Sequence, residues 1–251
     1  MRYLFALCFI LISCSKNKSE KNETNNSLEI VEKKSRKTIN IKNQLLHLKG
    51  DGRKSPENNI SVYGQYTTDR FEENNKSVIL DGISDYIEIE NHPNVNSKKE
   101  LTISIWYKPD SYKGIGQNAI VWKGSDKYEA PYCQYLFSAI GNLYPSTPAV
   151  FKFGLSIDGK FNQIQTKPNI WEPNKWYNIV GTYDGVKMIL FVNGTLQNQR
   201  AIPGELNLYD TPVLIGKTPH KDFFTSGSYD DFRVFDRALT SGEIKILSEE
   251  M

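Results

Sequence analysis

The sequence predicts an all-β fold of two stacked antiparallel sheets, followed by one short C-terminal helix. From residue 45 onward, short apolar runs alternate with polar residues at period two, and turn dipeptides separate these runs. Roughly a dozen such runs follow one another without an internal repeat, which fits one two-layer domain better than two domains.

The strongest strand signals are Asp-Gly and Asn-Gly pairs, because these residues tolerate the positive φ angles of tight hairpins. The pairs are Asp81-Gly82, Asp158-Gly159, Asp184-Gly185 and Asn193-Gly194. The clearest predicted hairpin joins strands at residues 176–183 and 187–192. In a further strand, at residues 101–108, alternate apolar residues share one face. These residues are Ile103, Ile105 and Tyr107.

The predicted C-terminal helix begins with a capping box. Thr240 is followed three residues later by Glu243, a spacing at which each side chain can bond a backbone N–H of the first turn. Apolar residues follow at Ile244, Ile246 and Leu247. We expect this helix to lie against the sandwich.

The first 13 residues have the features of a lipoprotein signal peptide. Arg2 precedes an apolar run from Tyr3 to Ile12, which is too short for a spanning helix of roughly 20 residues. The run ends in Leu-Ile-Ser-Cys, which resembles the bacterial lipobox and implies that Cys14 is acylated; the alternative is an ordinary secretory signal. Several acyl chains give a stable anchor. Ser15 resembles outer-membrane sorting, so we expect anchoring in the outer membrane, on its periplasmic or surface side.

Residues 14–44 predict a flexible polar tether, and residues 45–251 a separate sandwich domain. Residues 15–44 carry 8 basic and 4 acidic side chains and few apolar ones. Residues 45–251 carry 22 basic and 25 acidic side chains, and this mild acidity argues against nucleic-acid binding. Cys133 is the one cysteine of this domain, so we expect a packed core thiol and no internal disulfide.

Several segments occur in a fixed order along residues 45–251: SVILDGISDYIEIENHPNV, ELTISIWYKPD, IVWKG, KWYNIVGTYDGVKMILFVNGTLQ, VLIGK and SYDDFRVFDRALTSGEIKIL. Together they resemble the LamG-like jellyroll family of the concanavalin A-like lectin/glucanase superfamily. The resemblance implies a jellyroll sandwich whose first and last segments meet near Asp230-Asp231. Members of the superfamily include lectins, glycoside hydrolases and protein-binding modules, so the fold leaves the function open.

Glu88 and Glu90 are the candidate catalytic acids. They share one face of a predicted strand, roughly 6.5–7 Å apart by strand rise, and glycosidases use two carboxyl groups about 5–9.5 Å apart. Laminarinase-like relatives carry a Glu-x-Asp-x-x-Glu strand, whereas this chain has DYIEIENH, without the central Asp and the third acid. No nucleophile elbow, zinc motif or phosphate loop appears. We therefore expect a protein without catalytic residues.

The resemblance also implies a structural Ca²⁺ where the N-terminal segment meets the Asp-Asp-x-Arg strand. The candidate ligands are Asp51 and Asp231, because carboxylate oxygens suit this ion. Arg53-Lys54 stands where relatives usually carry an acidic residue, and two cations there would weaken the site. The alternative role of Asp231 is hydrogen bonding within the turn, with a nearby arginine.

Residues 125–150 hold four tyrosines and three prolines, and the segment is longer than the family's usual hairpin. Tyrosine rings can pack on the apolar face of a pyranose while neighbouring amides bond its hydroxyls. The candidate carbohydrate contacts are Tyr128, Tyr132, Tyr135 and Tyr144. The alternative is that several of these tyrosines cover the core, as we expect of the four tryptophans.

These observations predict a membrane-anchored, non-catalytic binding module whose partner is a glycan or glycoconjugate. The alternative is a structural or adhesive module that binds a surface protein. A glycoside hydrolase is the least favoured of the three hypotheses.

Overall fold

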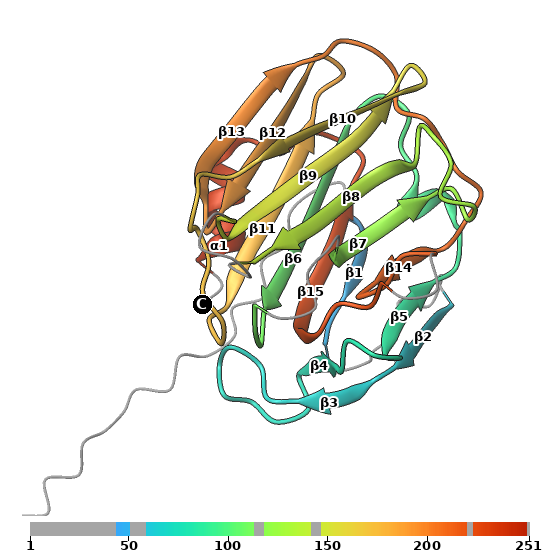
Figure 1. Cartoon of the computed structure of the whole chain (residues 1–251). Helices are drawn as coiled ribbons and strands as arrows, with labels where there is room; N and C mark the ends of the chain where they lie inside the picture. Colours follow the sequence, from blue (N-terminus) through green and yellow to red (C-terminus); the bar gives the residue numbers. More distant parts are fainter. Residues whose placement is uncertain (1–43, 51–58, 113–117, 142–146, 220–222, 250–251) are drawn as a thin grey trace, which may run out of the picture. The chain divides into compact units, whose positions relative to one another are not determined.

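The computed structural model describes residues 44–50, 59–112, 118–141, 147–219 and 223–249. In these residues the chain forms two stacked antiparallel sheets, one 3₁₀ turn (η1, Pro93–Val95) and one short α-helix (Figure 1). The prediction of an all-β jellyroll sandwich with a C-terminal helix is confirmed.

Sheet A brings the first and last described strands together. Its strand order is β13-β12-β11-β6-β15-β4-β3, and β1 pairs with β15 beside this path. The strands are β1 (Gln44–Leu48), β3 (Gln65–Thr67), β4 (Ser77–Leu80), β6 (Leu101–Lys108), β11 (Tyr177–Tyr183), β12 (Lys187–Val192), β13 (Thr195–Ala201) and β15 (Gly227–Phe235).

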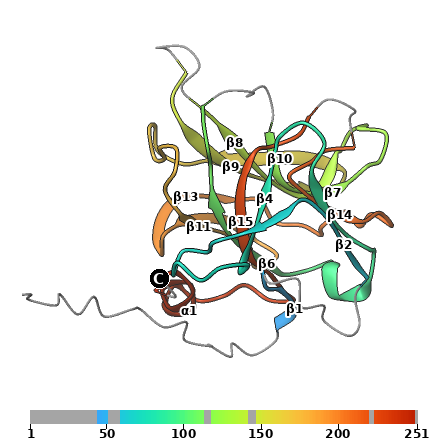
Figure 2. The same ribbon diagram turned by 90° about the horizontal axis from the view of Figure 1, so that it is seen from below.

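Sheet B has the strand order β10-β9-β8-β7-β14-β5-β2. Its strands are β2 (Ile60–Tyr63), β5 (Tyr86–Ile89), β7 (Asn118–Gly124), β8 (Cys133–Ile140), β9 (Val150–Ile157), β10 (Lys160–Gln165) and β14 (Val213–Ile215). Figure 2 shows the two sheets as separate layers, with α1 (Ser241–Ser248) on the outer side of sheet A.

Three of the four predicted dipeptides stand in hairpins, whereas Asp81-Gly82 lies in the connection from β4 of sheet A to β5 of sheet B. Asp158-Gly159 joins β9 to β10 with φ angles of 46° and 75°, and Asn193-Gly194 joins β12 to β13 with φ angles of 49° and 71°. Positive φ at both positions matches the right-handed twist of two-residue hairpins. Asp184-Gly185 connects β11 to β12, as the sequence predicts.

Alternation along the strands builds the core between the sheets. Ile103, Ile105 and Tyr107 of β6 belong to the main buried cluster, which confirms the face predicted for them. The same cluster takes Phe137 from β8 and Phe153 from β9. Of the tryptophans expected to pack, Trp106, Trp122 and Trp171 are buried and Trp176 is half-buried.

The capping box of α1 is present. The Thr240 hydroxyl accepts from the Glu243 backbone N–H, and the Glu243 carboxylate accepts from the Thr240 backbone N–H. Ile244 and Leu247 are buried against apolar side chains on the outer face of sheet A, including Phe235 of β15. In the described residues, no helix is both long and apolar enough to cross a membrane.

Candidate functional site: an aromatic pocket on sheet B

A pocket of about 330 Å³ lies on the outer face of sheet B, across strands β7 to β10. We call it the aromatic pocket, because rings from three parts of the chain form its wall. Trp122 stacks on Tyr128 with centroids 5.4 Å apart, and Tyr128 lies 5.4 Å from Tyr132. Tyr132 meets Phe161 edge-to-face at 5.8 Å. The other lining residues are Leu136, Ser138, Ile140, Lys152, Gln163 and Thr218.

Strand alternation explains why these side chains meet. Successive residues of a strand point to opposite faces of the sheet. Phe137 of β8 and Phe153 of β9 face the core, so their neighbours Leu136 and Lys152 face outward into the pocket. In β10, Phe161 is brought onto the same outer face.

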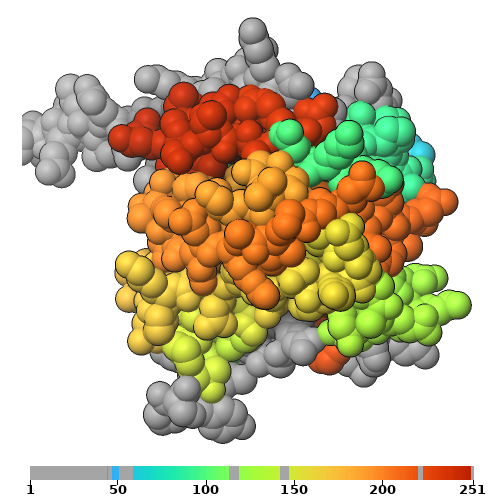
Figure 3. Space-filling model, turned by 90° about the horizontal axis from the view of Figure 1, so that it is seen from above, coloured from blue at the N-terminus to red at the C-terminus, as the bar shows by residue number. Residues whose placement is uncertain are grey.

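The loop 125–132 between β7 and β8 supplies two of the rings, the half-buried Tyr128 and the exposed Tyr132. Its two ends are joined by a hydrogen bond of 2.7 Å from the Ser125 N–H to the Tyr132 carbonyl. Tyr128 and Tyr132 have φ angles of 58° and 74°, a left-handed conformation that bulky residues rarely adopt. Such strained backbone often occurs at functional sites. Figure 3 shows this loop in lime green at the surface, beside yellow and orange segments of the neighbouring strands.

A glycine lets the two strands of this hairpin come close together. A Cβ on Gly124 would lie 2.3 Å from the Tyr132 carbonyl oxygen and 2.3 Å from Cys133 Cα. Only glycine avoids these contacts. The close approach of the two strands at the end of β7 therefore sets where the loop 125–132 begins.

The pocket wall also carries polar groups. Its charged lining residue is Lys152, half-buried, and burial lowers the pKa of this lysine. Among the described residues, neither the Trp122 Nε1 nor the Thr218 Oγ1 has a hydrogen-bond partner, although both atoms are buried. Apolar rings with a few polar groups are typical of small-ligand sites.

The structure brings two of the four predicted tyrosines together. Tyr128 and Tyr132 both line the aromatic pocket, and Tyr132 is 36% exposed. The prediction for Tyr135 is wrong, because its side chain is fully buried in the core and its hydroxyl donates to the Val95 carbonyl at 3.1 Å. A ring in that position cannot stack on a sugar. Tyr144 lies outside the described residues.

Several pocket residues were not identified from the sequence. Phe161 and Lys152 come from strands that follow the tyrosine loop, and Trp122 was expected only to pack. Strand alternation signals that Lys152 points away from Phe151 and Phe153, but the register of β8, β9 and β10 is not visible in the sequence.

A second, polar hollow of about 370 Å³ lies between β10 and β13. We call it the amide groove, after the side chains that line it: Gln163, Gln165, Asn198, Gln199 and Arg200, with Ile164. The Asn198 side-chain amide donates to the Gln165 carbonyl at 2.8 Å and so ties the two sheet edges together. Gln163 lines both the groove and the aromatic pocket.

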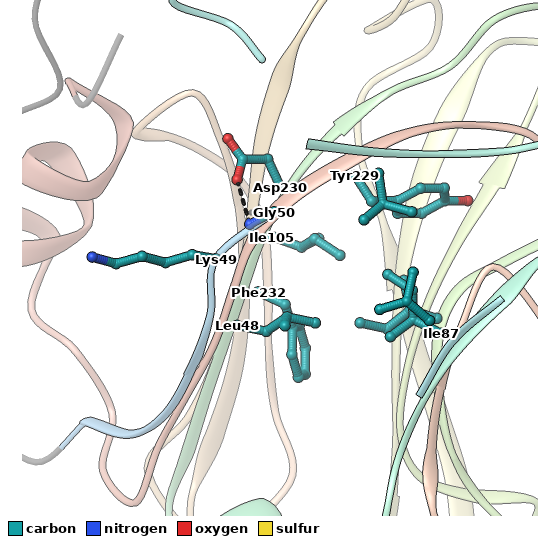
Figure 4. A pocket seen from close by; sticks show the side chains of 11 residues that line it. Leu48, Lys49, Gly50, Ile87, Ile105, Tyr229, Asp230 and Phe232 are labelled. Atoms are coloured by element: carbon teal, nitrogen blue, oxygen red, sulfur yellow. Dashed lines mark hydrogen bonds between the residues drawn. The ribbon is translucent and has the colours of Figure 1, made fainter. Parts of the chain in front are cut away.

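A third hollow, between Leu48, Ile87 and Phe232, is too small to hold a ligand. Its volume is about 10 Å³, room for about one water molecule at most. Figure 4 shows the Gly50 backbone N–H donating to Asp230 at the edge of this hollow, over 3.1 Å. The hollow marks the junction between the first and last described strands.

Charged residues at this junction pair with one another. Arg70 donates to Asp230 at 2.5 Å and to Asp231 at 2.6 Å, and its guanidinium lies 4.5 Å from the Trp106 ring. The His47 Nε2 lies 2.6 Å from the other Asp231 oxygen. Burial alone would raise the pKa of Asp231, but His47, Arg233 and Arg70 hold it well below its ordinary value.

These contacts do not fit the calcium site that the resemblance implies at Asp231. Both carboxylate oxygens of Asp231 already face the imidazole of His47 or the guanidinium of Arg70. A Ca²⁺ ligand set needs several free oxygens, and the described residues contain no cluster of three or more acidic, His or Cys side chains that could hold a metal. Asp51, the other predicted ligand, lies outside the described residues.

Neither Glu88 nor Glu90 is among the lining residues of the aromatic pocket. Glu88 stands in β5 opposite Ser61, and the Glu90 carboxylate accepts from Asn59 at 2.7 Å. Cys133 is buried, as expected of a packed thiol, and burial raises its pKa far above the ordinary value.

Comparison with known families identifies the class. Residues 81–245 match the Laminin_G_3 family model, described as the concanavalin A-like lectin/glucanases superfamily. The match covers well over half of the chain, and the chain therefore belongs to this family. The family resemblance predicted from the sequence motifs is confirmed. Among curated proteins, none matches the sequence.

The similar solved structures include toxin binding domains. The binding domain of Paraclostridial Mosquitocidal Protein 1 is 16% identical, with a TM-score of 0.63, over 82% of this chain and 52% of that one. The botulinum neurotoxin serotype G binding domain is 17% identical, with a TM-score of 0.64, over 82% and 51%. The serotype D ligand binding domain, solved with N-acetylneuraminic acid, is 17% identical, with a TM-score of 0.63, over 82% and 50%. This chain spans about half of each, and the likeness shows the fold.

Proposed function

We propose that this protein is a non-catalytic binding module that recognises carbohydrate or glycoconjugate through the aromatic pocket. The observation that carries the proposal is the set of four touching rings, Trp122, Tyr128, Tyr132 and Phe161, beside polar side chains on an exposed sheet face. Aromatic faces pack on the C–H face of a pyranose ring, and the polar wall bonds its hydroxyls.

The comparisons support a binding role at a coarser level. Neighbours of the same fold are receptor-binding or ligand-binding domains of toxins, and one of them was solved with a sialic acid. Concanavalin A-like folds also occur in enzymes, so function has to be argued from the site. In the described residues, the aromatic pocket has no carboxylate in its wall that would act as acid or nucleophile.

We further propose that the module is presented at the bacterial outer membrane. The lipobox-like sequence at Cys14 supplies the anchor, and the polar segment 14–44 acts as a spacer between lipid and sandwich. Incorporation of labelled palmitate tests this part: label is expected on the wild-type protein and absent from Cys14→Ser. Label on neither protein would contradict the proposed lipid anchor, but it would not count against ligand binding at the aromatic pocket.

A glycan array tests the binding function. The full chain is applied as Cys14→Ser, so that no acyl chain contributes, and as the same protein with Tyr132→Ala. We expect signals on a restricted group of glycans that Tyr132→Ala reduces strongly. As a matched control, Tyr66→Ala removes a tyrosine that is 45% exposed but does not line the pocket. No signal on any glycan, or equal signals for the two tyrosine variants, would contradict the proposal.

A protein-binding module is the second candidate, because exposed apolar side chains also occur on and beside strands β2 to β4. Tyr63 is 50% exposed, Tyr66 45%, Ile79 40% and Ile83 76%. Single exposed apolar residues are common, whereas a contiguous patch marks an interface. Crosslinking of a partner on intact cells from a photoreactive residue at the exposed position 84, with loss of the crosslink when Ile83→Ser is added, would favour this candidate.

A further inference from the structure

We infer that the ligand is an acidic oligosaccharide that runs from the aromatic pocket across Gln163 into the amide groove. The inference rests on the proposed function and goes further, because it names the ligand's charge, its minimum extent and its path. Three observations carry it: the residue that the two hollows share, the absence of carboxylates from their described walls, and the cation in each hollow.

The two hollows follow one strand. Phe161 and Gln163 line the aromatic pocket, and Gln163 and Gln165 line the amide groove, so alternate residues of β10 form one continuous floor. The distance from Phe161 to Gln165 is about 13 Å at the rise of an antiparallel strand. That length exceeds a single pyranose ring, so a chain of sugars is needed to occupy both hollows.

The polar groups of the groove suit a saccharide. Side-chain amides offer both donors and acceptors, as ring hydroxyls do. Gln163 is half-buried between the two hollows, and Gln165, Asn198 and Gln199 are exposed along the groove. Aromatic rings at one end and amides at the other give two different subsites for consecutive sugar units.

The positive charge of the two hollows favours a negatively charged ligand. Lys152 lines the pocket and Arg200 lines the groove, and the described lining residues of both hollows include no Asp or Glu. Lys152 is half-buried, so water is partly excluded around its side chain, and this burial lowers the pKa of the lysine. A carboxylate on the sugar would pair with its ammonium group, and hydrogen bonds between charged partners are the strong ones. Arg200 can hold a second carboxylate in bidentate geometry.

Calorimetric titration of the full chain carrying Cys14→Ser tests the inference. The probes are oligogalacturonate, hyaluronan and oligomannuronate fragments of two to six sugar units, each with its carboxyl methyl ester as a neutral match. We expect at least one acid to bind about tenfold or more tightly than its ester. Lys152→Gln is expected to remove this preference for the disaccharides and to reduce it for the longer fragments, whose second carboxylate still pairs with Arg200. Arg200→Gln is expected to weaken only the longer fragments, which alone reach the groove.

Lys160→Gln is the matched control, because this exposed lysine of β10 lines neither hollow, and its affinities are expected to equal those of the parent protein. Equal affinity for acids and esters, or an acid preference of the disaccharides that survives Lys152→Gln, would overturn the inference. Failure of every acid to bind would also overturn it. The proposed function would still stand if a neutral glycan bound in a Tyr132-dependent manner, and it would fall with the inference if no glycan bound.

Discussion

The ring of Tyr132 stands almost perpendicular to the ring of Phe161, at 87° and with centroids 5.8 Å apart. Tyr132 closes the loop after β7, and Phe161 lies in β10, the edge strand of sheet B. The contact therefore spans the outer surface of strands β8 and β9. Edge-to-face ring pairs are favourable beyond the area that they bury, so this contact stabilises the arrangement of the pocket wall.

Gly154→Ala is expected to weaken glycan binding without unfolding the protein. Gly154 lies in β9 below the Phe161 ring, and an added Cβ would lie 2.8 Å from two ring atoms, so the ring must move. Phe161 is half-buried and can shift outward, so we expect a stability loss below about 1 kcal/mol. Affinity is expected to fall several-fold, as measured by titration with a glycan selected on the array. Unchanged affinity would mean that the position of Phe161 does not matter for binding.

Gly181→Ala tests a contact between a glycine and an aromatic ring inside the core between the sheets. Here an added Cβ would lie 2.6 Å from the Phe153 ring, which is fully buried between the sheets and has no room to move. We expect a loss of about 1–3 kcal/mol in the free energy of unfolding, measured by urea denaturation.

Gly242→Ala is the control for this substitution, since it lies in the first turn of α1 and its Cβ would meet only the Thr240 hydroxyl, at 3.9 Å. Alanine is the better helix former, so this variant is expected to be as stable as the parent or slightly more stable. Equal stability of Gly181→Ala and Gly242→Ala would contradict the packing described for β11.

Asp231→Asn is expected to destabilise the junction between β1 and β15. The change removes the charge that faces Arg70 and His47, and the Arg70 side chain is only 3% exposed. Breaking a buried ion pair from one side costs about 3–5 kcal/mol. For comparison, Glu205→Gln breaks the exposed Lys98–Glu205 pair at 2.8 Å, and its loss of stability is expected to be much smaller, because exposed ion pairs contribute little. Thermal denaturation measures both variants, and similar losses would show that the Asp231 pairs contribute little.

Glu243 is expected to make stability depend on pH. Its hydrogen bond with Arg237 is the largest cause that lowers the pKa of Glu243 to about 2. An unfolded glutamate titrates near 4.3, so this stabilisation is complete above that pH and is lost as the pH falls toward 2. Relative to Glu243→Gln, the parent protein should be about 1 kcal/mol more stable at pH 7, and the difference should shrink at pH 3. A difference that is constant with pH would contradict this assignment.

Local signals in the sequence were sufficient for individual turns and for the start of the helix. The Asn193-Gly194 turn and the Thr240–Glu243 capping box each depend on neighbours within a few residues, so both were predicted correctly. The predicted sugar contact at Tyr135 failed because the alternation along β8 is weak. The strand reads Cys-Gln-Tyr-Leu-Phe-Ser-Ala-Ile, with apolar residues on both faces, so its sequence does not show that Tyr135 points inward.

The candidate site could be predicted only in part. Tyr128 and Tyr132 could be predicted to lie close together because they share one loop. Phe161 and Lys152 reach the same pocket through the pairing of β8, β9 and β10, and this register depends on contacts far apart in the sequence. Likewise, Arg70 and Asp231 are 161 residues apart, so the pair that occupies the expected calcium ligand is not visible as a motif.

The most direct test of the central claim is calorimetric titration of the full chain carrying Cys14→Ser with the strongest glycan from the array. Tyr132→Ala removes the ring that bridges Tyr128 and Phe161, whereas Tyr66→Ala removes an exposed ring outside the pocket. The account predicts about tenfold weaker binding for Tyr132→Ala and parental affinity for Tyr66→Ala. Parental affinity for Tyr132→Ala, with both variants folded, would contradict binding at this pocket.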